Sequence, residues 1–283
     1  MNETRMILRK AEEKIMLCEK EYAIECTDFL DPLQGSCVRQ GLHLGKGEPL
    51  SVSGRIIGEK YVYRSMTLVF TGGYEDAERQ ILAVLPEYIL PETILDPEEI
   101  LNNSDLEILK AVRFTHKQNA ARGFGGGALG HRDYLGAMMG LGIRREVTGD
   151  ILVREDGADC MVLPRMAEYV AENLTKAGRA GLTAETIPVL DVLPPEDKGE
   201  EIVCTLASLR LDNALAAAFH ISRTEAKKAI GEGLVFVDHR EAEKADQEVG
   251  GGALLVIRHK GRVRLREISG ETRKGRIRCI FVK

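Results

Sequence analysis

Residues 208–237, SLRLDNALAAAFHISRTEAKKAIGEGLVFV, decide the fold of the C-terminal part of the chain. Ser222 and Glu225 make a capping box, in which each side chain accepts a hydrogen bond from the other residue's backbone amide, so a helix begins there. Gly233 ends it before Leu234–Val237, whose composition is typical of a strand. Upstream, apolar residues at helical spacing predict an earlier helix: Leu211, Ala214, Leu215, Ala218 and Phe219. The stretch therefore predicts two short helices that lead into a small sheet.

Basic side chains follow this helical hairpin and the strands after it. Arg223 and Lys227 lie four residues apart on one helix face. Further on, arginines alternate with Val263 and Leu265, which places the arginines on one face of a strand. Cations on a helix exterior are often only solvated, but an arginine-lined strand favours phosphate contacts. The predicted RNA-binding residues are Arg210, Arg223, Lys227, Lys228, Arg258, Lys260, Arg262, Arg264, Arg266, Arg276 and Arg278.

The charge of the chain is distributed unevenly. Its net charge is −5, which alone argues against a protein that binds nucleic acid. Residues 201–283, however, hold 16 lysines and arginines against 11 acidic residues, whereas residues 1–200 hold 23 against 33. The C-terminal region is therefore a candidate polyanion-binding module on an acidic chain.

The 283 residues are enough for three domains, and we predict an α+β chain with that division. A small α+β domain covers residues 1–95, and a second domain covers residues 96–190. Residues 191–200 are acidic and contain Pro-Pro, so they form a predicted linker. Residues 201–283 hold the helical hairpin and its small sheet.

The second domain has a recognisable order of elements. We predict a strand, a helix, two strands, a helix and a strand at Leu106–Phe114, His131–Leu141, Asp150–Arg154, Cys160–Leu163, Pro164–Ala177 and Leu182–Leu190. This βαββαβ order is that of the ferredoxin-like fold, which many RNA-recognition domains share. The strand at 160–163 lacks the aromatic residues on which such domains stack bases. Arg132, Arg144 and Arg145 are therefore the possible secondary RNA contacts.

Other sequence signals argue against several function classes. There is no membrane-spanning run or apolar N-terminal signal region, so we expect a cytoplasmic protein. The six cysteines form no C-x-x-C pair, so we expect reduced thiols and no metal site. Gly125–Gly130 fits G-x-G-x-x-G but does not directly follow a strand, which favours a flexible loop over a dinucleotide site. Because no catalytic constellation is evident, we expect no enzyme activity and no cofactor.

The motifs resemble known families. Arg210–Asp212, Ser222–Lys228 and Gly233–Val237 resemble the RNA-binding domain first seen in ribosomal protein S-four. Four further segments resemble the middle and N-terminal domains of the YlmH-like proteins: His131–Val153, Asn173–Arg179, Phe29–Pro32 and Gly72–Arg79. Together these resemblances span nearly the whole chain.

The resemblance implies a non-catalytic RNA-binding protein of three domains. Such proteins associate with ribosomal RNA and peptidyl-tRNA on the large ribosomal subunit, and they assist C-terminal tailing of stalled nascent chains in bacterial quality control. Arg210 and Arg223 match residues that contact RNA in short relatives. We expect a monomer that binds the ribosome and tRNA but no membrane. The alternative is an RNA-modifying enzyme, of the methyltransferase or pseudouridine synthase type, whose C-terminal module delivers the RNA substrate.

Overall fold

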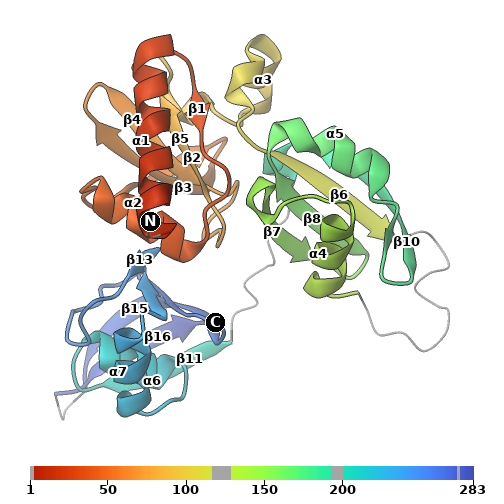
Figure 1. The fold of residues 1–283 in the computed structure, drawn as a ribbon. Coiled ribbons are helices and arrows are strands. Elements are labelled where there is room, and N and C mark those ends of the chain that lie inside the picture. The colour runs from red at the N-terminus through yellow and green to blue at the C-terminus, as the bar shows by residue number, and fades with distance from the viewer. Residues whose placement is uncertain (1–2, 117–128, 193–199, 273–274) are drawn as a thin grey trace. The chain divides into compact units, whose positions relative to one another are not determined.

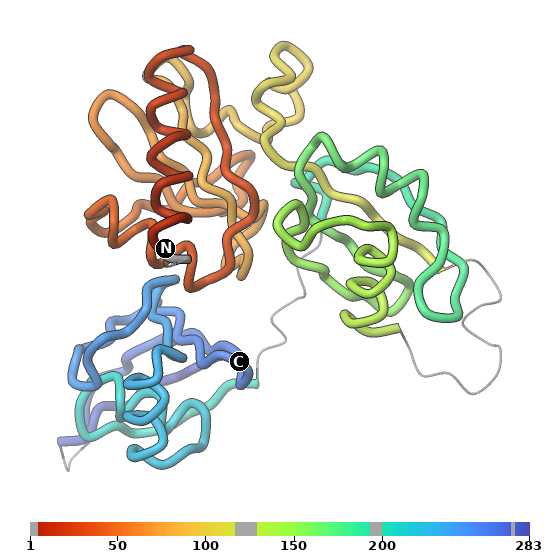
Figure 2. Tube along the Cα trace, in the orientation of Figure 1, coloured from red at the N-terminus to blue at the C-terminus, as the bar shows by residue number. Residues whose placement is uncertain are grey.

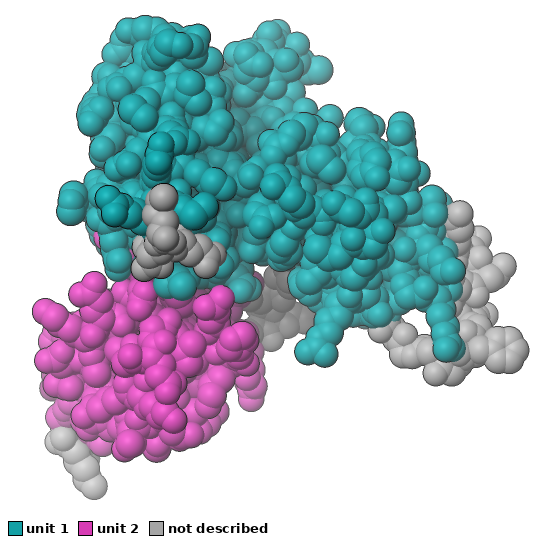
Figure 3. Space-filling model, viewed as in Figure 1, with its two compact units in different colours: residues 1–195 teal, residues 196–283 magenta. Residues whose placement is uncertain are grey.

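The computed structural model describes residues 3–116, 129–192, 200–272 and 275–283. They form two compact units, unit 1 (Met1–Pro195) and unit 2 (Glu196–Lys283), which Figure 3 shows in teal and magenta. Each unit is built around its own apolar clusters. Within the described residues, no helix combines the length and apolar character needed to cross a membrane.

The N-terminal part of unit 1 is an antiparallel sheet packed against two helices, α1 (Glu3–Glu21) and α2 (Pro32–Gly41) (Figure 1). Its strand order is β1-β5-β4-β3-β2, formed by β1 (Glu25–Cys26), β2 (Glu48–Val52), β3 (Arg55–Tyr63), β4 (Met66–Thr71) and β5 (Ile81–Leu85). Asp31 caps α2 by accepting a hydrogen bond from the Gln34 amide, and the side chain of Gln34 completes the capping box. This cap starts a helix that the apolar pattern alone does not predict.

The second part of unit 1 is a sheet in the order β7-β8-β6-β10-β9. Its strands are β6 (Lys110–His116), β7 (Thr148–Val153), β8 (Gly157–Val162), β9 (Lys176–Ala177) and β10 (Ala180–Ile187). Helix α4 (His131–Gly140) connects β6 to β7, and helix α5 (Pro164–Asn173) connects β8 to β9 and β10. The order of the four longer strands is that of the ferredoxin-like fold, so the predicted βαββαβ domain is confirmed.

Most element boundaries in this domain differ from the prediction by a few residues, and the two largest differences are at helix α5 and strand β6. Helix α5 ends at Asn173, and Lys176–Ala177 forms strand β9 instead of a last helical turn. Strand β6 begins at Lys110, because Ser104–Leu106 forms a 3₁₀ helix (η2). The other short helical segments of unit 1 are α3 (Pro97–Asn102), η1 (Pro91–Thr93), η3 (Arg145–Val147) and η4 (Val189–Asp191).

Polar contacts join the two sheets of unit 1. The Asp150 carboxylate, on β7, accepts hydrogen bonds of 2.7 Å from the Tyr74 hydroxyl and from the Glu78 amide. Arg79 donates to the carbonyl oxygens of Thr148 and Phe29 at 3.1 and 3.3 Å. One apolar cluster includes residues of both sheets. The proposed division of this unit at residue 95 therefore stays a prediction.

Unit 2 has a six-stranded antiparallel sheet in the order β11-β16-β15-β14-β12-β13. The strands are β11 (Glu201–Leu206), β12 (Val235–Val237), β13 (Arg240–Glu241), β14 (Leu254–Ile257), β15 (Gly261–Glu271) and β16 (Ile277–Val282). Helices α6 (Leu211–Ala218) and α7 (Arg223–Gly231) follow β11, and the chain trace in Figure 2 returns at its C-terminal end to β11. The predicted hairpin of two helices followed by a strand is confirmed.

Candidate nucleic-acid interface

Three of the predicted RNA-binding cations surround one buried carboxylate in unit 2. Asp212 lies in the first turn of α6 and has no exposed surface. Its carboxylate accepts hydrogen bonds from Arg210 at 3.2 and 3.3 Å and from Arg223 at 2.8 Å, and the Lys227 ammonium lies 3.7 Å away. The three cationic side chains remain 38%, 52% and 53% exposed, respectively. The group, which we call the Asp212 cluster, therefore keeps positive charge available at the surface.

The electrostatics of this cluster favour the ionised carboxylate. Burial opposes the charge on Asp212, but hydrogen bonds from Arg210 and Arg223 outweigh it and lower the pKa of Asp212 to about 2. The hydrogen bond to Asp212 in turn raises the pKa of Arg210. At neutral pH the cluster thus holds three positive charges and one negative charge in fixed positions, which is an arrangement suited to phosphate.

Helix α7 places two of the cluster's cations. The Ser222 hydroxyl accepts a hydrogen bond from the Glu225 amide at 3.1 Å, and the Glu225 carboxylate accepts one from the Ser222 amide at 2.9 Å. The predicted capping box is therefore present. Because it fixes where the helix begins, Arg223 occupies the first helical position and Lys227 follows one turn later on the same face.

The arginines of β15 and β16 lie on the other face of the sheet. Val263 and Leu265 are buried in the core that contains α6 and α7, so Arg262 and Arg264, which alternate with them, point away from the helices. Arg278 alternates in the same way with buried Cys279 and pairs across the sheet with Thr205. The predicted alternation is confirmed, but the structure separates these arginines from the Asp212 cluster by the thickness of the sheet.

Several outer-face arginines have partners within unit 2. Arg264 donates to the Gly252 carbonyl at 2.7 Å, and Arg266 contacts Glu201 at 2.7 Å. Arg276 donates to the Thr205 hydroxyl and carbonyl at 3.1 and 2.6 Å.

On the helical side, Lys228 is 74% exposed and lies 3.7 Å from Glu232. Arg258 and Lys260 are exposed in the turn between β14 and β15. RNA contact by each of these residues stays a prediction.

The possible secondary contacts in the middle domain do not form one group. Arg132 is exposed in the first turn of α4, and Arg144 is exposed beyond the other end of that helix. Arg145 is partly buried and donates to the carbonyl oxygens of Thr148 and Gly149 at 3.0 and 2.8 Å. Its guanidinium therefore stabilises the start of β7.

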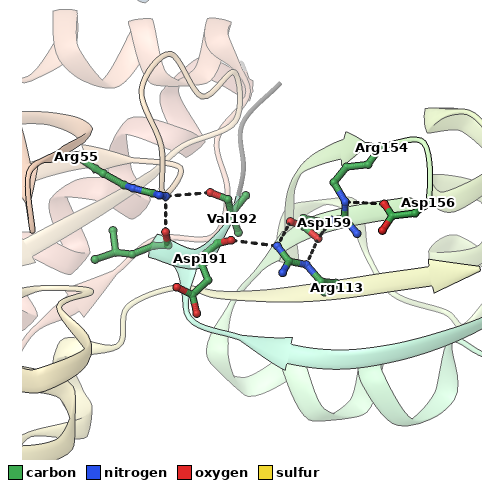
Figure 4. Close-up of polar contacts among 8 residues, drawn as sticks. Arg55, Arg113, Arg154, Asp156, Asp159, Asp191 and Val192 are labelled. Carbon is green, nitrogen blue, oxygen red and sulfur yellow. Dashed lines mark hydrogen bonds and ion pairs between the residues drawn. The ribbon is translucent and has the colours of Figure 1, made fainter. Parts of the chain in front are cut away.

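A second cluster of charges was not predicted from the sequence (Figure 4). Asp159 is fully buried on β8, and Arg113 from the neighbouring strand donates to both of its oxygens at 2.9 and 2.7 Å. Arg154 contacts the same carboxylate and also Asp156. Arg113 also donates to the Asp191 carbonyl at 3.0 Å. The register of β6 against β8 brings Arg113 beside Asp159, and no local motif indicates this pairing.

No catalytic arrangement is evident among the residues that the structure places. The Gly-rich segment falls largely on residues 117–128, which lie outside the described residues. At the end of β6, His116 Nε2 lies 2.9 Å from the hydroxyl of buried Tyr134, and burial raises the pKa of Tyr134 to about 12. In the described ranges, no group of three or more histidine, cysteine, aspartate or glutamate side chains could hold a metal ion.

Comparisons with known proteins give two family matches. Residues 127–191 match the family described as "Putative RNA-binding domain in YlmH", and residues 209–255 match the family described as "S4 domain". Over 278 residues, 98% of this chain and 94% of the relative, the sequence is 32% identical to the ribosome-associated protein quality control protein P2 of Bacillus subtilis (strain 168). A solved structure, the cell division protein ylmH from Streptococcus pneumoniae, is 19% identical and aligns with 68% of this chain and 96% of its own chain. Its TM-score of 0.46 is too low to support a structural argument.

Proposed function

The chain belongs to the YlmH family, and we propose that it is a ribosome-associated RNA-binding protein that catalyses no reaction itself. We infer that unit 2 binds ribosomal RNA of the large subunit and tRNA in the cytoplasm, during quality control of stalled translation. The name of the Bacillus relative supports the process, and the two matched domain families support the ligand.

The Asp212 cluster is the observation that carries this proposal. Phosphate oxygens accept charge-assisted hydrogen bonds from guanidinium and ammonium groups whose geometry is fixed in advance. Arg210 and Arg223 each donate to Asp212, yet each side chain stays partly exposed. Their remaining donors are thus free to bind phosphate while the internal hydrogen bonds to Asp212 stay in place. Such contacts position RNA and do not read its sequence.

Co-sedimentation with purified large ribosomal subunits tests the proposal. The double variant Arg210→Ala/Arg223→Ala should bind subunits at least tenfold more weakly, since it removes two hydrogen-bonded phosphate contacts of about 0.7–1.5 kcal/mol each. The double variant Arg5→Ala/Lys10→Ala removes two exposed cations of α1 and should bind as the wild type does.

A second pair of substitutions protects the test against unfolding. Arg210→Gln/Arg223→Gln removes the charges but keeps hydrogen-bond donors near Asp212, and its melting temperature is compared with that of the wild type. If both double variants are folded and still sediment with the subunits as the wild type does, the assignment is wrong. An RNA-methylating enzyme would instead bind S-adenosylmethionine in calorimetry, and that outcome would favour the enzyme alternative.

A further inference from the structure

The ferredoxin-like sheet of unit 1 has a central strand that is buried on both faces. Every residue of β8 is buried. On one side, Cys160 Sγ lies 3.6 Å from Met138 Sδ of α4. On the other side, Met161 packs near Gly73, where an added Cβ would lie in ordinary contact, 3.4 Å, with Met161 Sδ. RNA-recognition motifs stack bases on the central strands of this sheet, and β8 offers no exposed surface for that.

We therefore expect RNA bound by this domain to contact another surface, and exposed cations indicate the candidate surfaces. Nine lysines and arginines are described between residues 96 and 192. Five are engaged within the protein, namely Lys110, Arg113, Arg145, Arg154 and Arg165. The side chains of the other four are exposed and have no ion pair or hydrogen bond with described residues: Arg132, Arg144, Lys176 and Arg179.

Three of these four cations lie at one end of α4. Gly178 has a positive φ of 55° in the turn between β9 and β10, and an added Cβ there would lie 3.6 Å from Asp133 Oδ1. Arg179 follows Gly178 in the chain, and Arg132 precedes Asp133. The two arginines are therefore neighbours of a pair of residues that lie close together. Lys176 lies on β9, opposite Gly181. Arg144, by contrast, lies beyond the far end of α4, about 15 Å along its axis for a helix of ten residues.

We propose that Arg132, Lys176 and Arg179 form a second RNA-binding surface, which contacts the phosphate backbone of ribosomal RNA. The inference rests on the proposed function, and it assigns that function to a surface of unit 1. The adjoining acid, Asp133, accepts a hydrogen bond of 2.8 Å from the Gly130 amide at the positive end of α4, and the three cations outnumber it. Exposed cations from α4 and from the β9–β10 hairpin that have no ion pair with described residues suit backbone contacts, which position RNA without reading bases.

The family match supports RNA as the ligand at this place. Residues 127–191, which match the family described as "Putative RNA-binding domain in YlmH", include all three cations. Electrostatic attraction to an acidic protein could use the same side chains, but counterion release from RNA gives a steep dependence of affinity on salt. The salt dependence of binding is therefore the property to measure.

The test compares four full-length proteins by binding to purified large ribosomal subunits between about 50 and 300 mM salt. They are the wild type, Arg132→Ala/Lys176→Ala/Arg179→Ala, Arg210→Ala/Arg223→Ala, and the control Arg5→Ala/Lys10→Ala/Lys46→Ala. The control removes three exposed cations from the N-terminal part of unit 1, so its net charge equals that of the first triple variant. Bulk tRNA replaces the subunits in a parallel series, which separates ribosomal RNA from tRNA as the source of the phosphate.

The inference predicts a selective change in salt dependence. With large subunits, the magnitude of the negative slope of log affinity against log salt should decrease by about 3 for the first triple variant, about 1 for each cation removed. For the control, the slope should stay unchanged. The variant Arg132→Lys/Lys176→Arg/Arg179→Lys retains the three charges, so its slope should equal that of the wild type.

Three outcomes overturn the inference. The first is an unchanged slope in the first triple variant. The second is an equal decrease in the magnitude of the slope in the control. The third is a decrease that is seen with tRNA but not with large subunits. None of these outcomes contradicts the proposed role of unit 2. That role is contradicted separately if Arg210→Ala/Arg223→Ala binds large subunits with the affinity of the wild type.

Discussion

At the scale of single residues, Asp212 decides how the charges of unit 2 are used. A carboxylate with no exposed surface is costly unless it is paired, and here Arg210 and Arg223 donate to it while Lys227 lies nearby. The carboxylate in return restricts the rotamers of long side chains that would otherwise lose entropy on binding RNA. We therefore expect an acid at the centre of the proposed site to favour the binding of an anion.

The variant Asp212→Asn separates positioning from net charge. It makes unit 2 more positive, so long-range attraction alone predicts tighter RNA binding. If Asp212 positions the cations, affinity for large subunits should instead fall severalfold, since each guanidinium loses its charged partner. Filter binding at fixed salt measures this, and tighter binding by the variant would show that positioning is unimportant.

The same variant should also change how stability depends on pH. The folded-state pKa of Asp212, about 2, lies below its ordinary value of 3.8, so the ionised form stabilises the fold above that ordinary value. Near neutral pH, the free energy of unfolding of the wild type should exceed that of Asp212→Asn by about 1–2 kcal/mol, after allowance for the exposed partners of Asp212. This difference should shrink as pH falls from about 4 towards 2, as urea unfolding at several pH values would reveal.

At the scale of elements, helix α7 and the alternation of β15 place the cations. The capping box at Ser222 sets the register of α7, and hence the face that carries Arg223 and Lys227. The period of two in β15 places Arg262 and Arg264 on the face of the sheet that is turned away from α7. Elements with simple local patterns thus place basic residues both on helix α7 and on the opposite face of the small sheet.

Removal of the α7 cap should weaken both the helix and RNA binding. Ser222→Ala leaves the Glu225 amide without its acceptor and should cost about 1 kcal/mol, or about 4–8 °C in melting temperature for a unit of this size. Ser222→Asp keeps an acceptor at the cap and should melt close to the wild type. Differential scanning calorimetry of the two variants checks this, and equal melting of Ser222→Ala and wild type would show that the cap contributes little.

At the scale of the whole molecule, the chain combines an acidic unit with a basic one. The net charge of −5 conceals a C-terminal region in which 16 basic residues outnumber 11 acidic residues. Local charge controls contact with RNA, because charges farther away than about 10 Å are screened at 0.1 M salt. Acidic residues of unit 1 that lie farther than this from a basic surface therefore do not cancel its positive charge.

The affinity of the intact protein for large subunits should accordingly fall steeply with salt, although the protein is acidic overall. The three cations of the Asp212 cluster alone predict a slope of log affinity against log salt of about −2 to −3. Fluorescence titration of labelled protein between about 50 and 300 mM potassium chloride measures this slope. A slope near zero would mean that phosphate contacts do not dominate binding.

The sequence by itself determined the local features of this protein. Apolar spacing and the Ser222–Glu225 pair determined the helical hairpin, and the order of predicted elements determined the ferredoxin-like domain. These features depend on residues a few positions apart, which a periodic pattern records. Helix α2 was not predicted, because its apolar pattern is weak and its start depends on the cap at Asp31.

Only the tertiary structure decided which charges are available. Arg145 and Arg113 have the same residue type as Arg132, but the first is bound to backbone carbonyls and the second to Asp159, 46 positions away in the chain. The turn at Gly178 likewise brings Arg179 beside α4 through packing between distant segments. A sequence pattern gives the number and spacing of cations. Whether a cation is paired or exposed depends on the packing of segments far apart in the sequence, which no local pattern contains.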